Sequence, residues 1–186
     1  MTVHDGNGGR PALFLDRDGT LNVDHGYVDR PERVDLVPGA AQAVAAARGM
    51  GMMVIVVSNQ SGVGRGYFGA AAMHRVNDTV RARLQAADAG ATLDGLYSCP
   101  HAPARAGEAG CDCRKPAPGM ILRAAREHGI DLTRSWTVGD KPSDVAAGRA
   151  AGTRTILISP DGDPDGADFG ARDLAEAVDR IRKVFG

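Results

Sequence analysis

Residues 12–20 read ALFLDRDGT, an apolar run that ends in two carboxylates one residue apart and then in Gly-Thr. The run predicts a strand from Ala12 to Asp16, and strand residues two positions apart point to the same side. Asp16 and Asp18 can therefore both reach the space beyond the carboxyl end of the strand, where open α/β sheets bind ligands. Two carboxylates this close repel each other, and a hard cation such as Mg²⁺ is their usual partner. A polar Asp-Gly turn with no further role would fit the same letters, so the rest of the chain has to decide.

Apolar runs and amphipathic segments alternate along the remainder of the chain. Further strands are expected at 52–57, 93–98, 135–139 and 153–159, and helices at 39–49, 69–88, 143–151 and 171–184, with another that follows Pro116 and Pro118 and ends near His128. The run MMVIVV at 52–57 is typical of a central parallel strand buried on both faces. Strands that alternate with helices predict an α/β fold with a doubly wound parallel sheet. Residues 21–37 are too long for a simple connection, so we expect a functional flap there but no large cap domain.

Length and composition narrow the class of protein. The chain has 186 residues, and we expect a single domain over 1–186 with a flexible N-terminal segment at 1–11. The net charge is −1 with no block of like charge, so no nucleic-acid partner is expected. Because no apolar run could span a membrane and no signal-peptide pattern is present, we expect a cytoplasmic protein without a membrane partner. Long apolar surface runs are also absent, so a monomer is expected.

Polar side chains follow four of the predicted strands. They are Asp16 and Asp18, Ser58 and Asn59, Arg114 and Lys115, and Asp140 and Asp144. The carboxyl ends of parallel strands meet at one edge of a sheet, so these groups are expected around one point. Phosphoryl transfer needs such a set, namely a nucleophile, which can be a carboxylate, a metal, and donors for the phosphoryl oxygens. For Lys115 alone, a solvated surface lysine is the alternative.

The same residues resemble the four ordered motifs of the haloacid dehalogenase (HAD) superfamily of phosphatases. The motifs are Asp16-Arg17-Asp18-Gly19-Thr20, then Ser58, then Lys115, then Gly139-Asp140-Lys141 with Asp144. The resemblance covers essentially the whole chain and implies the HAD-like Rossmannoid fold. It also implies that Asp144 orients Lys115 or the waters of a metal ion.

The resemblance implies a role for each of the other motif residues. Asp16 would be the nucleophile. Asp18 would be the acid that protonates the leaving alkoxide and then the base that activates water. Mg²⁺ would be held by the carboxylates of Asp16 and Asp140 and by the main-chain carbonyl of Asp18. Ser58 and Lys115 would hold the phosphoryl oxygens.

A second cluster lies in the loop 99–113, before the fourth predicted strand. Cys99-Pro100-His101 and Cys111-Asp112-Cys113 bring all three cysteines of the chain and a histidine into this loop. The set suits tetrahedral Zn²⁺, with two buried cysteines and a surface pair as the alternative. No open position would remain with Cys99, His101, Cys111 and Cys113 bound, so we expect a structural zinc loop. Such a loop would aim Arg114 and Lys115 at the site.

The zinc-loop motif resembles a subgroup that contains heptose 1,7-bisphosphate phosphatases and histidinol-phosphate phosphatases. The stretches NVDHGYV at 22–28 and NQSGVGRG at 59–66 favour the heptose enzymes. That resemblance implies substrate contacts from Asp24, His25, Gly26, Tyr27, Ser58, Asn59, Gln60, Ser61, Arg114, Lys115 and Lys141. For His25, an exposed loop histidine is the alternative. Arg114 is the better candidate to bind a non-reacting phosphate, and Arg65 is a second.

The activity that the resemblance implies is Mg²⁺-dependent hydrolysis of a sugar bisphosphate, the C7 phosphate of D-glycero-D-manno-heptose 1,7-bisphosphate. The reaction would pass through a phosphoaspartyl intermediate and leave heptose 1-phosphate for nucleotide activation. The alternative enzyme is a histidinol-phosphate phosphatase. An alternative of another class is a zinc-ribbon binding module, but the balanced charge and the 4% aromatic content argue against nucleic acid as its partner.

Overall fold

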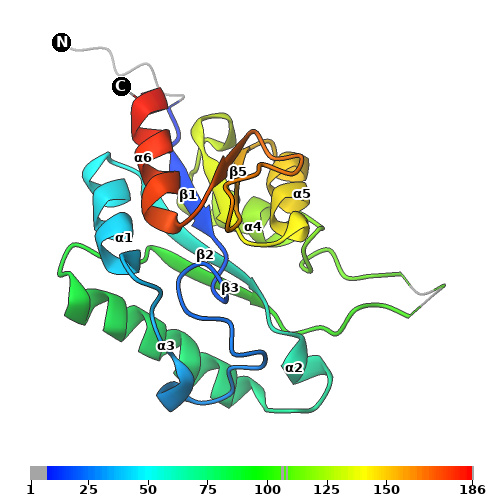
Figure 1. Ribbon diagram of the computed structural model, residues 1–186. Coiled ribbons are helices and arrows are strands. Elements are labelled where there is room, and N and C mark those ends of the chain that lie inside the picture. Colours follow the sequence, from blue (N-terminus) through cyan, green and yellow to red (C-terminus); the bar gives the residue numbers. More distant parts are fainter. Residues whose placement is uncertain (1–7, 106, 108, 186) are drawn as a thin grey trace, which may run out of the picture.

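The computed structural model describes residues 8–105, 107 and 109–185, and its centre is a six-stranded parallel sheet (Figure 1). The strands are β1 (Ala12–Leu15), β2 (Met53–Asn59), β3 (Gly95–Cys99), β4 (Trp136–Gly139), β5 (Arg154–Ile158) and β6 (Phe169–Ala171). Their order is β3-β2-β1-β4-β5-β6, and every neighbouring pair is parallel. From β1 the chain first adds β2 and β3 on one side of this strand, and then adds β4, β5 and β6 on its other side. This order confirms the predicted doubly wound α/β fold.

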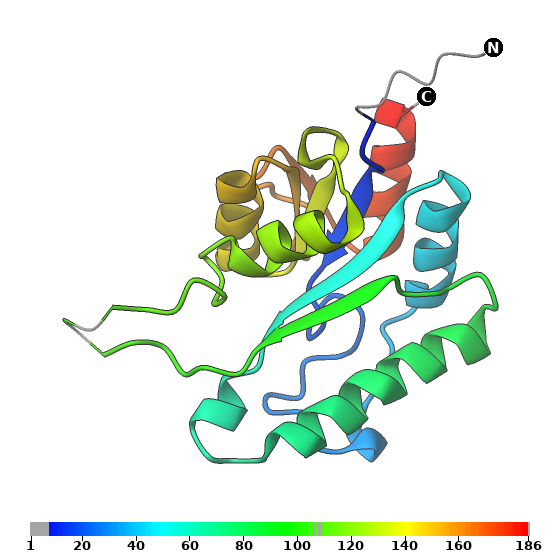
Figure 2. The same ribbon diagram turned by 180° about the vertical axis from the view of Figure 1, so that it is seen from behind.

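Helices cover both faces of this sheet (Figures 1 and 2). They are α1 (Ala40–Gly49), α2 (Ser61–Gly64), α3 (Ala70–Ala87), α4 (Gly119–His128), α5 (Pro142–Ala151) and α6 (Leu174–Phe185), with 3₁₀ turns at Pro31–Arg33 and Leu132–Arg134. On one face α1 contacts α3 and α6, and on the other α4 contacts α5. In the described part of the chain, none of the helices combines the length and the apolar character that crossing a membrane requires.

The side chains of β1 show why this strand lies at the centre. Leu13 and Leu15 are fully buried among the apolar residues of α1, α3 and α6. Ala12 and Phe14 are fully buried on the opposite face, among residues of α4 and α5. Because successive strand side chains alternate between faces, a strand covered on both sides has to be apolar at every position. This requirement explains the unbroken apolar run that precedes Asp16.

Two elements differ from the sequence prediction. Ala171, expected to begin the last helix, instead ends strand β6, and α6 begins at Leu174. A Cβ at Gly170 would lie only 1.9 Å from the carbonyl oxygen of Gly162 in the loop between β5 and β6, so this position in the short strand has to be a glycine. The short helix α2 is the second difference, since no helix is among the expected elements at 61–64.

The described end of the expected flexible N-terminal segment bonds to the loop after α4. Residues 1–7 of the segment lie outside the described residues. The main-chain N–H of Arg10 donates to the carbonyl of Gly129 (3.1 Å), and the N–H of Asp131 donates to the carbonyl of Arg10 (3.0 Å). These bonds involve only main-chain atoms, so side-chain composition gives no signal for them.

The flap at 21–37 is folded onto the sheet. Val28 and Val34 are buried in the core beside α1 and α3. The main-chain N–H of Val23 donates to the carbonyl of Asp35 (2.8 Å), which closes the segment into a loop. The anchored ends hold this part of the flap beside the carboxyl end of β1, where Asp24, Gly26 and Tyr27 line a cavity.

Candidate active site

A cavity of about 400 Å³ opens where the predicted strand-end residues meet. Its lining comes from the ends of β1, β2 and β4, from the flap and from the loop before α4. The lining residues are Asp16, Asp18, Asp24, Gly26, Tyr27, Ser58, Asn59, Gln60, Ser61, Arg114, Lys115, Lys141, Ser143 and Asp144. The parallel sheet thus gathers acids, a hydroxyl and cations that lie far apart along the chain.

Lys115 is a buried cation in this cavity, with only 4% of its surface exposed. Its Nζ lies 2.7 Å from Oδ1 of Asp16, 2.6 Å from Oδ1 of Asp144 and 2.7 Å from the carbonyl oxygen of Val57. Burial by itself would lower the pKa of Lys115, but the charges of Asp16 and Asp144 outweigh it and raise the pKa. Lys115 therefore stays charged beside Asp16 and can stabilise negative charge on a phosphoryl group there. This arrangement excludes the alternative of a solvated surface lysine.

The side chain of Asn59 fixes the main chain of Lys115. Nδ2 of Asn59 donates to the Lys115 carbonyl (3.0 Å), and Oδ1 of Asn59 accepts from the Lys115 main-chain N–H (3.0 Å). These two bonds attach the loop that carries Lys115 to the end of β2. Asn59 does line the cavity, as the resemblance implies, but its amide already has partners within the protein.

The carboxylate of Asp18 accepts four hydrogen bonds. Arg17 donates two, from Nε (3.1 Å) and from Nη2 (2.7 Å), while the side-chain amides of Gln60 and Asn22 donate one each (2.9 Å). Gln60 also donates to Oγ of Ser58 (2.8 Å), so the acid and the hydroxyl belong to one network. General acid–base catalysis requires such a carboxylate to be held in a defined orientation.

A group of acids beside Lys115 offers a site for a hard cation. Carboxylate oxygens of Asp16, Asp140 and Asp144 lie within 4.8 Å of one another. Oδ1 of Asp140 is buried and has no hydrogen-bond partner among the described residues. Burial raises the pKa of Asp140 to about 6; the charge of Lys141 opposes this, and those of Asp16 and Asp144 add to it. A divalent cation would satisfy the unpartnered oxygen and offset the repulsion, so this donor set fits Mg²⁺.

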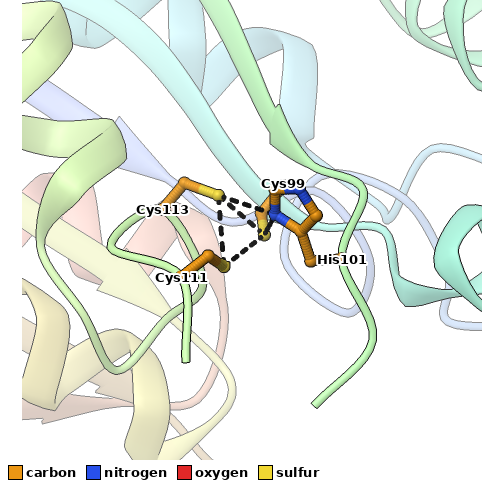
Figure 3. A group of neighbouring side chains, drawn as sticks. All are labelled: Cys99, His101, Cys111 and Cys113. Atoms are coloured by element: carbon orange, nitrogen blue, oxygen red, sulfur yellow. Dashed lines mark hydrogen bonds between the residues drawn. The ribbon is translucent and has the colours of Figure 1, made fainter. Parts of the chain in front are cut away.

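Figure 3 shows the second cluster, in which Cys99 and His101 meet Cys111 and Cys113. The Sγ atom of Cys113 lies 3.0 Å from that of Cys99 and 3.4 Å from that of Cys111, and Nδ1 of His101 lies 3.3 Å from it. All three thiols are free, and the four possible ligand atoms lie within 4.8 Å of one another. Thiolates around tetrahedral zinc lie about 3.7 Å apart, given Zn–S bonds of ~2.3 Å. A small outward movement would therefore let these side chains hold a metal ion.

Two further cations line the cavity. Nη1 of Arg114 donates to the carbonyl of His101 (3.1 Å), which ties this arginine to the cysteine cluster. Nζ of Lys141 lies 3.0 Å from Oδ2 of Asp24 in the flap. Burial alone would lower the pKa of Lys141, but the acids around it raise the pKa, so Lys141 is also charged. With Lys115, the cavity therefore presents three positive groups.

His25 is the one implied substrate contact that does not line the cavity. Its Nε2 lies 2.9 Å from Oδ2 of Asp35, and both side chains are exposed. The structure therefore places His25 as an exposed loop histidine. Arg65 does not belong to the lining either.

Comparison with known proteins identifies the family. The family model described as HAD-hydrolase-like matches residues 112–177. A D-glycero-beta-D-manno-heptose-1,7-bisphosphate 7-phosphatase of Pasteurella multocida (strain Pm70) is 42% identical over 157 residues, which are 83% of this chain and 84% of that protein. The chain belongs to the HAD-like heptose bisphosphate phosphatases. The resemblance seen in its motifs is thereby confirmed, and the chain is a phosphoric monoester hydrolase rather than a zinc-ribbon binding module.

Other members of the heptose bisphosphate phosphatases extend the match to nearly the whole chain. The Escherichia coli (strain K12) protein of the same name is 40% identical over 182 residues, 93% of this chain and 94% of that protein. The D,D-heptose 1,7-bisphosphate phosphatase of B. bronchiseptica, crystallised with magnesium and phosphate, has a TM-score of 0.81 at 31% identity and covers 94% of this chain and 99% of its own. The corresponding protein of Burkholderia thailandensis has a TM-score of 0.66 at 26% identity and covers 93% of this chain and 99% of its own.

Three residues of this phosphatase escape the sequence reasoning. Ser143 lines the cavity at the start of α5. Arg17, inside the first motif, is fully buried and bonds to Asp18. Asn77 on α3 bonds to Arg17 in turn. The available signal for Asn77 is its position four residues after Met73, which puts a polar side chain on the apolar stripe of a predicted helix.

Proposed function

We propose that this phosphatase removes the C7 phosphate of D-glycero-D-manno-heptose 1,7-bisphosphate and leaves heptose 1-phosphate, which supplies nucleotide-activated heptose synthesis. The observation that carries the proposal is the set of cations in one cavity: Lys115 beside Asp16, with Arg114 and Lys141 in the same lining. A bisphosphate needs cations for the phosphate that does not react as well as for the one that does. Relatives at 40–42% identity carry the name of this activity.

Two metal ions belong to the proposal. The carboxylates of Asp16 and Asp140 and the main-chain carbonyl of Asp18 would hold Mg²⁺, which when bound neutralises charge on the phosphoryl oxygens. The B. bronchiseptica relative holds magnesium and phosphate, which supports this assignment. Zn²⁺ would be a structural ion in the cluster of Figure 3, because three thiolates and an imidazole fill a tetrahedral site.

The residues of the chain divide the reaction into two steps. First, a carboxylate oxygen of Asp16 bonds to the phosphorus of the C7 phosphate, and the bond from this phosphorus to the sugar oxygen breaks. Asp18 gives its proton to the departing sugar oxygen. Second, Asp18 takes a proton from water, whose oxygen attacks the phosphorus and releases inorganic phosphate from Asp16. Lys115 and Ser58 bind the phosphoryl oxygens in both steps. One ester and one water thus give one alcohol and one phosphate.

The charge of the cavity distinguishes this substrate from histidinol phosphate. Histidinol phosphate would use the same nucleophile, but it carries one phosphate and a cationic amine. Arg114 and Lys141 would repel that amine, and no second phosphate would bind them. The arrangement therefore favours the bisphosphate.

The experiment compares kcat/KM of the purified protein with Mg²⁺ on heptose 1,7-bisphosphate, as each anomer, and on histidinol phosphate. We expect a preference of at least about tenfold for the heptose, and release of one phosphate per molecule. A preference for histidinol phosphate would overturn the substrate. Release of both phosphates from the heptose would overturn the selectivity for C7.

We also propose that the protein works as a single-domain monomer in the cytoplasm. Its three cysteines are free thiols brought together as possible metal ligands, which suits a reducing compartment. Light scattering on the purified protein should give the mass of one chain. A stable mass of two chains would contradict the monomer.

A further inference from the structure

Arg17 carries a buried positive charge that takes no part in the two reaction steps. Its side chain has no exposed surface, although arginine is rarely found fully buried without partners. Each of the three guanidinium nitrogens donates a hydrogen bond, to Asp18, to Gln60 or to Asn77. Four of its five N–H groups thus have a partner among the described residues, which holds this guanidinium in one orientation.

The orientation is set by the carboxylate of Asp18. Nε and Nη2 of Arg17 face its two oxygens, at 3.1 Å from Oδ1 and 2.7 Å from Oδ2. This is the side-by-side pairing in which a planar guanidinium fixes both the position and the rotation of a carboxylate. Nη2 also donates to Oε1 of Gln60 (3.0 Å), whose own amide donates to Asp18. Arg17 therefore holds the acid directly and through Gln60.

Asn77 on α3 holds Arg17 from the other side. Its Oδ1 accepts from Nη1 of Arg17 (2.8 Å), and its Nδ2 donates to Oγ of Ser98 on β3 (3.2 Å). Asn77 is 6% exposed. Neither Asn77 nor Arg17 belongs to the lining of the cavity, so neither is placed to touch substrate. Any effect of Asn77 on the reaction would therefore pass through Arg17 to Asp18.

We propose that Arg17, braced by Asn77, is the positioning residue that aims the carboxyl group of Asp18 at the leaving oxygen of the substrate. The proposal rests on the proposed function, because it requires Asp18 to protonate that oxygen. A sugar alkoxide is a poor leaving group and needs this proton. A nitrophenolate leaves without it, so hydrolysis of an aryl phosphate depends little on how Asp18 is aimed.

The experiment measures kcat/KM for heptose 1,7-bisphosphate and for 4-nitrophenyl phosphate in the same preparations. Because kcat/KM reports only the steps up to departure of the alcohol, the ratio between the substrates isolates the proton transfer from the later attack of water. The variants are Arg17→Lys, which keeps the charge but loses the paired geometry, and Asn77→Ala, which removes the brace. Thr79→Ala is the matched control on α3, since its hydroxyl donates to the Arg75 carbonyl within that helix (2.8 Å).

We expect Arg17→Lys to lower kcat/KM for the heptose by at least about tenfold and at most by the ~10²–10⁴ that general acid catalysis contributes. The value for the aryl phosphate should fall by less than about threefold. Asn77→Ala should lower the heptose value in the same selective way by about threefold to tenfold. Asn77→Ala made in Arg17→Lys should add little further loss, because both act on one carboxylate. Thr79→Ala should leave both substrates unchanged.

Equal losses on both substrates would overturn the proposal, since a merely structural role lowers the amount of active protein for every substrate. Unchanged values for both substrates would overturn it as well. If Arg17→Lys does not fold, as judged by circular dichroism, Asn77→Ala decides the outcome alone. If the wild type hydrolyses another alkyl phosphate in place of the heptose, the proposed substrate fails, and the ratio measured with that alkyl phosphate still decides the role of Arg17.

Discussion

The ammonium group of Lys115 lies 2.7 Å from Oδ1 of Asp16, although 99 positions separate the two residues along the chain. Asp16 follows β1, and Lys115 is attached through Asn59 to the end of the neighbouring strand β2. The pairing of parallel strands therefore decides which cation meets Asp16.

Replacing Lys115 by methionine should damage both activity and stability. The change removes the cation that lies between Asp16 and Asp144, and it leaves two buried carboxylates without compensation. Breaking a buried ion pair in this way costs about 3–5 kcal/mol, and losing one donor to the phosphoryl group lowers kcat about 10²–10³-fold. Urea unfolding without added Mg²⁺ and steady-state kinetics measure the two effects. Lys183→Met, at an exposed position on α6, is the control and should change neither quantity. A Lys115→Met protein as stable as the wild type would contradict the stabilising role of the buried ion pairs.

Replacing Asn59 by alanine should lower kcat by misplacing Lys115. Both hydrogen bonds of the Asn59 amide go to the main chain of Lys115, and a displacement of about 1 Å at a catalytic group can cost ~10²-fold. We expect kcat to fall about 10–100-fold with KM for the substrate nearly unchanged. A higher KM with normal kcat would show instead that Asn59 acts by binding substrate.

Replacing Asp140 by asparagine should stabilise the Mg²⁺-free protein and abolish its response to Mg²⁺. Burial raises the pKa of Asp140 from its ordinary 3.8 to about 6. Protonated Asp140 therefore favours folding below about pH 4, and this contribution is lost as the pH rises through about 6. At pH 7 the variant should have a higher Tm than the wild type. Added Mg²⁺ should raise the Tm of the wild type only.

Asp78→Asn, an exposed position on α3, is the control for this change and should behave as the wild type does. A rise in Tm on adding Mg²⁺ to Asp140→Asn would place the ion elsewhere.

Replacing Cys113 by serine should reduce bound zinc and weaken the reaction without altering the Mg²⁺ requirement. The Sγ atom of Cys113 lies within 3.0–3.4 Å of the other two thiols, and the next two residues are Arg114 and Lys115. We expect zinc content, measured by elemental analysis, to fall well below one per chain. Turnover should fall several-fold, with the Mg²⁺ concentration for half-activation unchanged. Asp112→Ala, between Cys111 and Cys113, is the control and should retain zinc. Full activity of zinc-free Cys113→Ser would refute the anchoring role of the loop.

The sheet and the assembly of the site are largely predictable from local sequence. The apolar run before Asp16 has to be buried on both faces, and the polar residues that follow β1, β2 and β4 have to meet at one edge. The spacing of Cys99, His101 and the later cysteines likewise predicts the cluster, because the four possible ligands lie within fifteen positions of the chain. These features depend on periodicity and spacing, which the sequence shows directly.

The remaining features depend on contacts that periodicity does not encode. The loop before β6 lies close against the strand because residue 170 is a glycine, and the bonds of Arg10 involve main-chain atoms only. The pairings of Arg17 with Asn77 and of Asn59 with Lys115 join residues that are 60 and 56 positions apart. Their geometry becomes visible only when α3 and the loop before α4 are placed against the sheet.

The most direct measurement follows the reaction of heptose 1,7-bisphosphate by phosphorus NMR, with the wild type and with Asp16→Asn. The wild type with Mg²⁺ should convert the C7 phosphate signal into inorganic phosphate and leave the C1 phosphate intact. Asp16→Asn should fold normally but turn over at least about 10³-fold more slowly, because the amide cannot replace the attacking carboxylate. Near-normal turnover by folded Asp16→Asn, or loss of the C1 phosphate in the wild type, would contradict the assignment of Asp16 as the nucleophile of a C7-selective phosphatase.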